Sequence, residues 1–273
     1  MEAVSMKKFR DIMLISDGDG TLLNQSNQIP QKNIEALRYF MKQGGSFVLA
    51  TGRPKNGARH IWEILPDHSM PTIYFNGALI YDPTQQAALH ADVLPAGMHQ
   101  VLQFLLDDFS EIGIECYTID QAFVLQDSEI TQMHIKMLHE TPQYVSVKDI
   151  PETGILKMFV TGSHQETRAV QHSLLETFPN MFQAVPSGDV FLEIFSLQSD
   201  KGAAVRFLKQ YYPQKKRFYA VGDNYNDFSM FREVEQAFVP ENGVPKAKEI
   251  GRVVSSCDTG ALFDVIQYLD ALY

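Results

Sequence analysis

Residues 11–21 read DIMLISDGDGT, and this stretch decides the fold class. Residues 11–16 form a nearly continuous apolar run, the pattern of a strand buried on both faces of a parallel sheet. A polar cluster with two aspartates and two glycines follows at once. In open α/β sheets, ligands bind at the carboxyl ends of the strands, so the cluster predicts a binding site there.

Strand and helix patterns alternate after this stretch. Residues 31–43 have the apolar spacing of a helix, with Pro30 before it and Gly44-Gly45 at its end. Strand patterns at 47–50 and 72–75 enclose a helix pattern at about 56–65. This βαβαβ start predicts a doubly wound parallel α/β sheet. The alternation resumes late in the chain, with a helix from 201, a strand at 218–221, a helix from about 227, a strand at 252–254 and a closing helix from 259.

The middle of the chain has a different pattern. Residues 98–109 are amphipathic, and two strand-like runs at 114–119 and 122–125 are separated by a plausible hairpin turn. Further strand patterns at 155–160 and 190–195 flank a helix pattern near 165–178. We therefore predict a core of residues 1–82 plus 197–273, interrupted by an inserted α+β domain of residues 83–196.

The composition is that of an acidic globular protein. Of the 273 residues, 45% are apolar, and 23 Lys and Arg against 33 Asp and Glu give a formal net charge of −10. This charge argues against nucleic acid or an anionic membrane as the main partner, but not against a small anionic substrate. No run approaches the roughly 18 apolar residues of a membrane helix. Residues 1–8 lack a signal-peptide core, so we expect a cytoplasmic protein.

The cysteines point to no metal site. Cys116 and Cys257 form neither a CxxC pair nor a zinc pattern, and they fit a reducing cytosol, although the sequence leaves a disulfide between them open. The histidines include no HxxxH or HxH spacing, which argues against a histidine metal site. We expect His134 and His139 to lie on a solvated surface of the inserted domain.

Four polar clusters stand where the sheet would present its ligand edge. They read DGDGT at 17–21, TGRP at 51–54, SDKG at 199–202 and GDNYND at 222–227. Each alone has a structural explanation, as a turn, a helix start, a solvated lysine or a helix cap. All four in this order are hard to attribute to chance. Together they hold the carboxylates of Asp17, Asp19, Asp223 and Asp227, the ammonium of Lys201 and the hydroxyl of Thr51.

These groups suit phosphate chemistry on a hard cation. Magnesium prefers oxygen ligands, usually one or two carboxylates with phosphate and water. The carboxylate of Asp17 can act as a nucleophile and form an aspartyl-phosphate. Asp19 is two residues further on, so the two side chains share a side if the strand continues. Lys201 can neutralise charge on the phosphoryl oxygens.

The four motifs closely resemble those of the haloacid dehalogenase (HAD) superfamily, and the chain looks most like its Cof-type phosphatases. The resemblance covers nearly the whole chain and implies a Rossmann-like core with a large α/β cap between the second and third motifs. It implies Asp17 as nucleophile, Asp19 as general acid/base and Lys201 as catalytic cation. Implied magnesium ligands are Asp17, Asp19 through its backbone carbonyl, and Asp223. Implied phosphate-binding groups are Gly18, Thr51, Gly52, Lys201 and Asn226, supported by Asp227, Arg53 and Asn76.

Two positions depart from the family pattern. Gly18 stands where a bulky apolar residue is usual, which leaves the backbone amide in place and makes the loop more flexible. Ser16 replaces the apolar residue before the nucleophile, which is harmless if Asp17 keeps its place.

We expect a magnesium-dependent phosphatase acting on a small phosphorylated metabolite. The resemblance suggests sugar phosphates first and pyridoxal or flavin phosphates second. A phosphomutase is the alternative with the same chemistry, but it needs a second phosphate site in the cap, where no dense arginine cluster is present. A catalytically idle sensor of phosphorylated ligands is the alternative from another class. The intact set of Asp17, Asp19, Lys201 and Asp223 speaks against it.

Overall fold

The computed structural model describes residues 7–65 and 69–273. The chain divides into two compact units. The core unit comprises the described residues of Met1–Gly52, Arg59–Leu89 and Asp200–Tyr273, and the cap unit comprises Arg53–Ala58 and His90–Ser199. These boundaries lie several residues from the expected ones at 82/83 and 196/197. The short segment Arg53–Ala58, expected in the core, groups with the cap.

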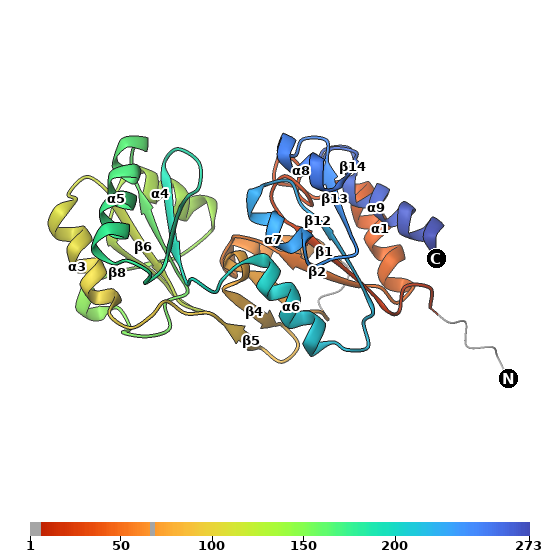
Figure 1. Ribbon diagram of the computed structural model, residues 1–273, viewed down its shortest axis with the longest axis horizontal. Helices are drawn as coiled ribbons and strands as arrows, with labels where there is room; N and C mark the ends of the chain where they lie inside the picture. The colour runs from red at the N-terminus through yellow and green to blue at the C-terminus, as the bar shows by residue number, and fades with distance from the viewer. Residues whose placement is uncertain (1–6, 66–68) are drawn as a thin grey trace. The chain divides into compact units, whose positions relative to one another are not determined.

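The core unit is built on a mixed sheet. Within the described residues it has eight strands in the order β14-β13-β12-β1-β2-β3-β4-β5 (Figure 1). The pairs from β14 to β3 are parallel, and β4 runs antiparallel to β3. This confirms the doubly wound parallel sheet. Its strands are β1 (Ile12–Asp17), β2 (Ser46–Ala50), β3 (Thr72–Tyr74), β4 (Leu79–Asp82), β5 (Ala87–Ala91), β12 (Arg217–Val221), β13 (Gln236–Pro240) and β14 (Arg252–Val254).

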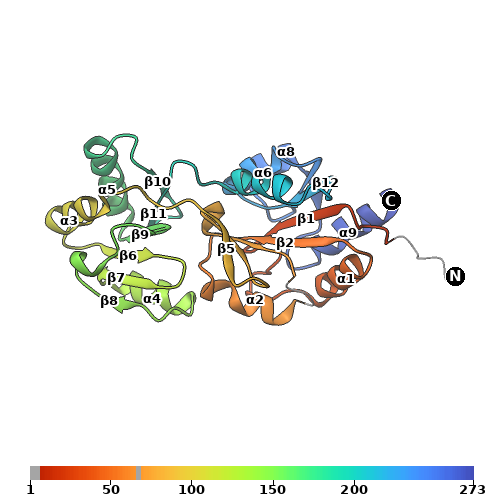
Figure 2. The same ribbon diagram turned by 90° about the horizontal axis from the view of Figure 1, so that it is seen from below.

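Helices cover both faces of the core sheet. Figure 2 shows α6 (Lys201–Tyr211) and α8 (Pro245–Ile250) on one side of β1 and β2, and α1 (Gln31–Lys42) on the other. Side chains of α6, α7 (Phe228–Phe231) and α8 pack on the face of β1 that carries Met13 and Ile15. On the opposite face, α1 packs beside α9 (Ala261–Leu272). The core unit also contains α2 (Arg59–Ile64).

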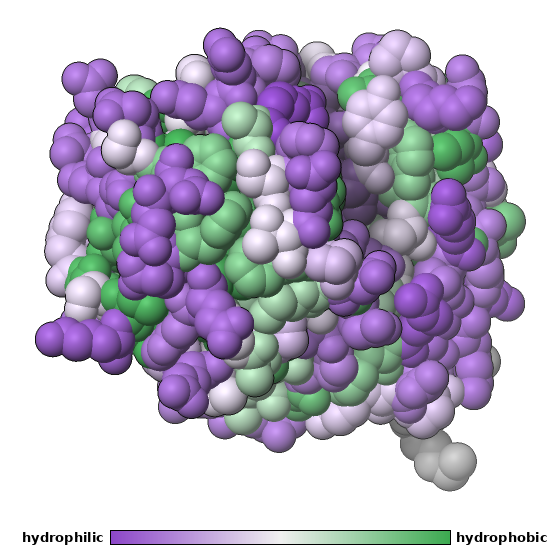
Figure 3. Space-filling model, turned by 60° about the vertical axis from the view of Figure 1, so that its left-hand side comes forward, coloured by the Kyte–Doolittle hydropathy of each residue, from purple (hydrophilic) through white to green (hydrophobic). Residues whose placement is uncertain are grey.

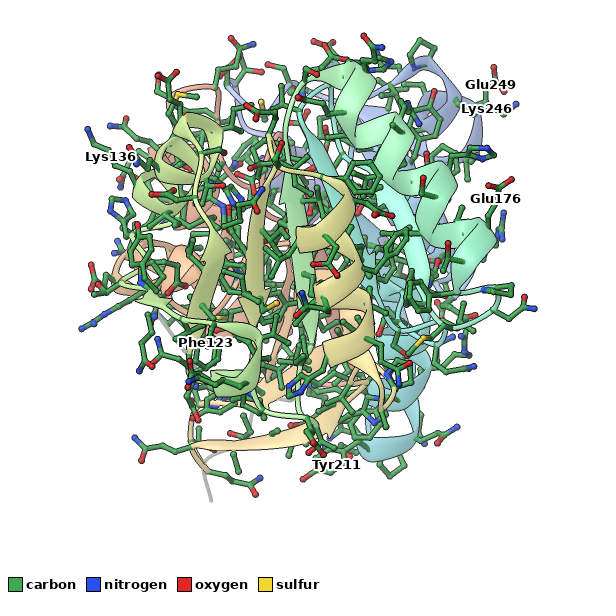
Figure 4. The ribbon with its side chains drawn as sticks, turned by 90° about the vertical axis from the view of Figure 1, so that its left-hand side faces the viewer. Phe123, Lys136, Glu176, Tyr211, Lys246 and Glu249 are labelled. Carbon is green, nitrogen blue, oxygen red and sulfur yellow. The ribbon has the colours of Figure 1, made fainter. Side chains whose placement is uncertain are left out.

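The cap unit contains a second sheet, in the order β10-β11-β9-β6-β7-β8. Its strand pairs are antiparallel except β7 with β8, which fits the expected α+β character. The strands are β6 (Gly113–Tyr117), β7 (Ala122–Gln126), β8 (Gln143–Tyr144), β9 (Lys157–Thr161), β10 (Gln183–Pro186) and β11 (Phe191–Phe195). Apolar side chains of one sheet face pack against α3 (Met98–Asp108) and α5 (His164–Thr177). Figure 4 shows these helices in front of the cap strands, with Glu176 of α5 pointing away from them.

The opposite face of the cap sheet carries both polar and aromatic side chains, and α4 (Glu129–Met137) packs on it. Nδ1 of His134 lies 2.9 Å from Oε2 of Glu115, which also accepts a hydrogen bond from the Tyr117 hydroxyl at 2.6 Å. The expectation that His134 lies on a solvated surface is therefore wrong, because its side chain is buried against the sheet. His139, two residues beyond α4, is exposed as expected.

The surface and the thiols agree with the composition. In the space-filling view, hydrophilic side chains cover much of the visible face, with apolar groups interspersed among them (Figure 3). None of the helices in the described chain is long and apolar enough to cross a membrane. Cys116 and Cys257 are both free and buried, so the disulfide left open by the sequence is not formed.

Candidate active site

The carboxyl edge of the core sheet brings three of the four motifs together. Asp17 is the last residue of β1 and pairs with Ala50, the last residue of β2. On the other side of β1, Ser16 pairs with Val221, the last residue of β12. The clusters that begin at Thr51 and Gly222 therefore start beside Asp17. Ser16 is buried, and its hydroxyl donates to the Asp17 carbonyl at 2.8 Å, so this departure from the family pattern leaves no polar group unpaired.

The remaining motif, SDKG at 199–202, reaches the same edge through the start of α6. Asp200 caps this helix by accepting a hydrogen bond from the Ala203 amide, and Lys201 is its first residue. The Lys201 ammonium is buried between two carboxylates, with Nζ 2.5 Å from Oδ1 of Asp17 and 2.7 Å from Oδ1 of Asp227. Burial by itself lowers the pKa of Lys201, but the attraction of both carboxylates outweighs it and raises the pKa. Lys201 is therefore held as a cation.

Both oxygens of Asp227 already accept hydrogen bonds. Its Oδ1 accepts from Lys201, and its Oδ2 accepts from the backbone amides of Asp223 at 2.9 Å and Asn224 at 3.0 Å. The side chain is fully buried. Asp227 thus fixes both the Lys201 ammonium and the loop that carries Asp223.

The carboxylates of Asp17, Asp223 and Asp227 form a cluster suited to a divalent cation. One oxygen of each lies within 4.8 Å of the others. Three buried or half-buried carboxylates face one ammonium, which leaves negative charge in excess. Burial raises the pKa of Asp17 well above its ordinary value; Lys201 offsets part of this rise, and the neighbouring carboxylates add to it. Burial and then repulsion by Asp227 raise the pKa of Asp223 to about 6. Oxygen donors with excess charge fit a hard cation such as Mg²⁺.

Asp19 does not lie within this cluster. The strand β1 ends at Asp17, and Asp19 instead forms an isolated bridge with Leu23. The condition for the two side chains to share one side of a continuing strand is therefore not met. The Asp19 side chain is exposed. Its predicted roles, proton transfer through the carboxylate and metal binding through the backbone carbonyl, stay predictions.

The predicted phosphate-binding residues lie around the same strand ends. Thr51 is buried, and a side chain added at Gly18 would lie 3.5 Å from its hydroxyl oxygen. Gly52 lies against the Asn76 carboxamide, whose Oδ1 accepts a hydrogen bond from Nδ2 of Asn226 at 3.1 Å. The structure thus brings Gly18 near Thr51, and Gly52 and Asn226 to Asn76.

Arg53 behaves differently from its neighbours in the same motif. Its guanidinium is buried and donates to the Gly57 carbonyl at 3.0 Å, closing a local turn. The residue belongs to the cap unit. Its predicted supporting role at the phosphate stays a prediction.

Two residues that the sequence did not single out position the motifs. The Thr21 hydroxyl donates to Oδ1 of Asp223 at 3.1 Å. Asn242, in the loop after β13, donates to the Gly20 carbonyl at 2.7 Å and accepts from the Cys257 amide at 2.8 Å. A Thr within the first motif was a usable signal. Asn242 lies 222 residues from Gly20, and no local pattern marks it.

Comparison with known proteins decides the family. The family model for haloacid dehalogenase-like hydrolases matches residues 14–264. This chain belongs to the haloacid dehalogenase-like hydrolase family. The match spans all four motifs and the segment inserted between the second and the third. The resemblance drawn from the sequence is therefore confirmed.

Relatives of this HAD-like hydrolase agree in sequence and in structure. An HMP-PP phosphatase of Escherichia coli is 24% identical over 233 residues, covering 85% of each chain. A haloacid dehalogenase-like hydrolase from Bacteroides thetaiotaomicron has a TM-score of 0.84 at 21% identity, covering 94% of this chain and 98% of the other. A HAD/COF-like hydrolase from Plasmodium vivax has a TM-score of 0.81 at 21% identity, covering 97% of both chains. The fold, with its inserted cap, is therefore that of the Cof-type branch.

Proposed function

We propose that this HAD-like hydrolase is a magnesium-dependent phosphatase that hydrolyses small phosphomonoesters through an aspartyl-phosphate on Asp17. The observation that carries the proposal is the position of the Asp17 carboxylate. It lies at the end of β1 with Oδ1 held by the buried Lys201 ammonium and with Asp223 and Asp227 within metal-binding distance. A carboxylate held in this way can present its other oxygen to a phosphorus atom.

In the first step, an oxygen of Asp17 bonds to phosphorus and the bond from phosphorus to the leaving alcohol breaks. Asp19 gives its proton to the departing alkoxide. In the second step, water attacks phosphorus, Asp19 takes a proton from it, and the bond between phosphorus and Asp17 breaks to release phosphate. Lys201 stabilises the charge that develops on the phosphoryl oxygens.

The remaining groups bind and orient the phosphoryl group. The amides of Gly18 and Gly52, the Thr51 hydroxyl and the Asn226 carboxamide would hold its oxygens. Magnesium, held by Asp17 and Asp223 with the Asp19 carbonyl, would neutralise phosphate charge when bound. We assign Asp227 a supporting role, because its oxygens hold the Lys201 ammonium and the backbone amides of the loop that carries Asp223.

The substrate is a small phosphorylated metabolite of the cytoplasm. The relatives support a phosphatase, since one is named an HMP-PP phosphatase and another solved structure with a TM-score of 0.78 is named a HAD subclass IIB sugar phosphatase. Sugar phosphates remain our first choice of substrate. Between residues 83 and 196 the cap carries a single arginine, Arg168. A phosphomutase needs a second phosphate site in the cap, and a single arginine does not support such a site.

The test is a panel of phosphomonoesters assayed with the purified protein. We expect hydrolysis with magnesium, loss of activity after chelation, and little recovery with calcium, whose looser coordination suits in-line transfer poorly. Asp17→Asn should be inactive on every ester. Binding of phosphorylated ligands without any turnover would instead support the idle sensor. Turnover that survives exhaustive chelation would exclude the magnesium dependence.

A further inference from the structure

The turn between β3 and β4 has an unusual backbone. Three consecutive residues have left-handed angles, with φ of 52° at Phe75, 56° at Asn76 and 111° at Gly77. Such angles cost free energy in residues with a side chain, and more in a bulky residue such as phenylalanine. They persist where the surroundings over-determine them, and they cluster at functional sites.

Contacts on three sides hold this turn in place. The Asn76 amide donates to the Thr51 carbonyl at 3.0 Å, and the Phe75 side chain is buried. Gly77 lies against the backbone at the start of α6, where an added Cβ would come within 2.2 Å of the Asp200 carbonyl oxygen. No residue other than glycine fits there. The turn is thereby packed between Thr51, which precedes Gly52, and Asp200, which precedes Lys201.

The conformation places the Asn76 carboxamide between two motifs that are distant in sequence. Its Oδ1 accepts from Nδ2 of Asn226 at 3.1 Å, across 150 positions of the chain. The same oxygen lies 3.1 Å from the position of a Cβ added at Gly52. Asn226 is exposed and lies in the short turn Tyr225–Asp227. The Asn76 contact therefore restrains an exposed amide that would otherwise sample several rotamers.

We infer that Asn76 is a positioning residue that orients Asn226 toward the phosphoryl group, and that the left-handed turn exists to hold it there. The inference rests on the proposed function, because that function makes Asn226 a phosphate ligand. Asn76 itself acts through Asn226. Asparagine tolerates the left-handed region better than most residues, which suits it to this position.

Glycine and alanine at position 76 separate positioning from a structural role. Both remove the carboxamide, but glycine also relieves the left-handed strain and alanine does not. We expect Asn76→Gly to unfold at or above the wild-type temperature and Asn76→Ala to unfold below it. Despite this difference, both should lose about 10- to 100-fold in kcat/KM. This is the range expected when Asn226 loses its hydrogen bond to the charged phosphoryl group. Affinity for orthophosphate, measured by calorimetry with magnesium, should fall with them.

Two further variants complete the experiment. Asn226→Ala should cost a similar factor, and adding Asn76→Gly to it should cost less than about twofold more, because the residue to be positioned is gone. Asn180→Gly is the matched control, since Asn180 is an exposed left-handed asparagine (φ 58°) in the cap. This control should keep wild-type activity.

The outcomes are distinguishable. Wild-type activity and phosphate affinity in a folded Asn76→Gly variant would overturn the inference, as would an unfolded Asn76→Gly variant or losses that multiply in full in the double variant. If the wild type itself lacks Asp17-dependent turnover, the proposed function fails. The orthophosphate affinities of the variants then still decide the role of Asn76.

Discussion

The Nζ of Lys201 lies 2.7 Å from Oδ1 of Asp227, and neither side chain is accessible to solvent. Their sequence separation is 26 residues, yet α6 and the turn after β12 hold the pair beneath the carboxylate of Asp17. The contact links the cation of the third motif to the loop of the fourth. Its removal would disturb both together.

Asp227→Asn is expected to destabilise the fold. The asparagine carboxamide has only one oxygen. Its NH₂ group would therefore face either the Lys201 ammonium or the backbone amides of Asp223 and Asn224, all of which are donors. Each buried donor left unpaired costs about 1–3 kcal/mol. Urea unfolding in the absence of metal should show the loss.

The control for this change is Asp223→Asn. It should remove metal binding and activity, but it should not lower the stability of the metal-free protein, because it relieves repulsion with Asp227. Equal destabilisation by both substitutions would contradict the assignment of a supporting role to Asp227 and a ligand role to Asp223.

Magnesium should raise the unfolding temperature more at neutral pH than in acid. The pKa of Asp223, raised to about 6 by burial and by Asp227, lies above that of the unfolded chain. The metal-free fold therefore binds the extra proton between about pH 4 and 6 and loses this stabilisation as the pH rises through 6. A bound cation replaces the proton there. We expect the magnesium-induced rise in unfolding temperature, measured by differential scanning fluorimetry, to become larger as the pH increases through 6. Asp223→Asn should abolish this pH dependence.

Substitutions of Asp17 and of Asp19 should affect catalysis in different ways. Asp17→Asn should abolish phosphoryl transfer. Asp19→Asn should cripple hydrolysis of a sugar phosphate, whose leaving alkoxide needs a proton, a contribution of about 10²–10⁴-fold. On nitrophenyl phosphate it should give a burst of about one equivalent of nitrophenol followed by slow turnover.

Acid quenching and mass spectrometry should place the phosphoryl group of that burst on Asp17. A label on another residue, or an Asp19→Asn variant that is equally slow on both esters with no burst, would reject this division of roles.

Gly18→Ala should stabilise the first loop and keep activity. The nearest atom to an added Cβ is the Thr51 hydroxyl oxygen at 3.5 Å, an ordinary contact. Loss of unfolded-state freedom then contributes about 0.4–1 kcal/mol. Gly20→Ala is the matched comparison and should have the opposite effect on stability. The φ of Gly20 is +75°, and the added Cβ would lie 2.7 Å from Oδ2 of Asp223. Thermal unfolding and an activity assay of both variants test the pair.

The cap shows where sequence patterns misled. Helix α4 buries Thr131, His134 and Ile135, while Met133 and Met137 are exposed. Two of the inward residues are polar because the sheet supplies partners for them, Glu115 for His134 and Thr161 for Thr131. Those partners come from other strands, so hydrophobic periodicity within the helix could not reveal them.

The expected start of the cap erred for a related reason. The Pro83 position breaks the α/β alternation, but the chain then returns as β5 to extend the core sheet. Whether a strand pairs with the edge of a sheet depends on which strand lies beside it in the fold. The sequence of β5 alone does not reveal that neighbour.

The sequence by itself determined the alternating architecture, the inserted domain and the four motifs, because apolar periodicity and the polar residues after each strand are local properties of the chain. Tertiary structure decided how the charges are distributed. It left Asp19 exposed and outside the cluster of Asp17, Asp223 and Asp227, bound Asp227 to Lys201 and the loop amides, and joined Asn76 to Asn226. These relationships depend on distances between residues far apart in the chain, and burial then sets the strength of each electrostatic interaction.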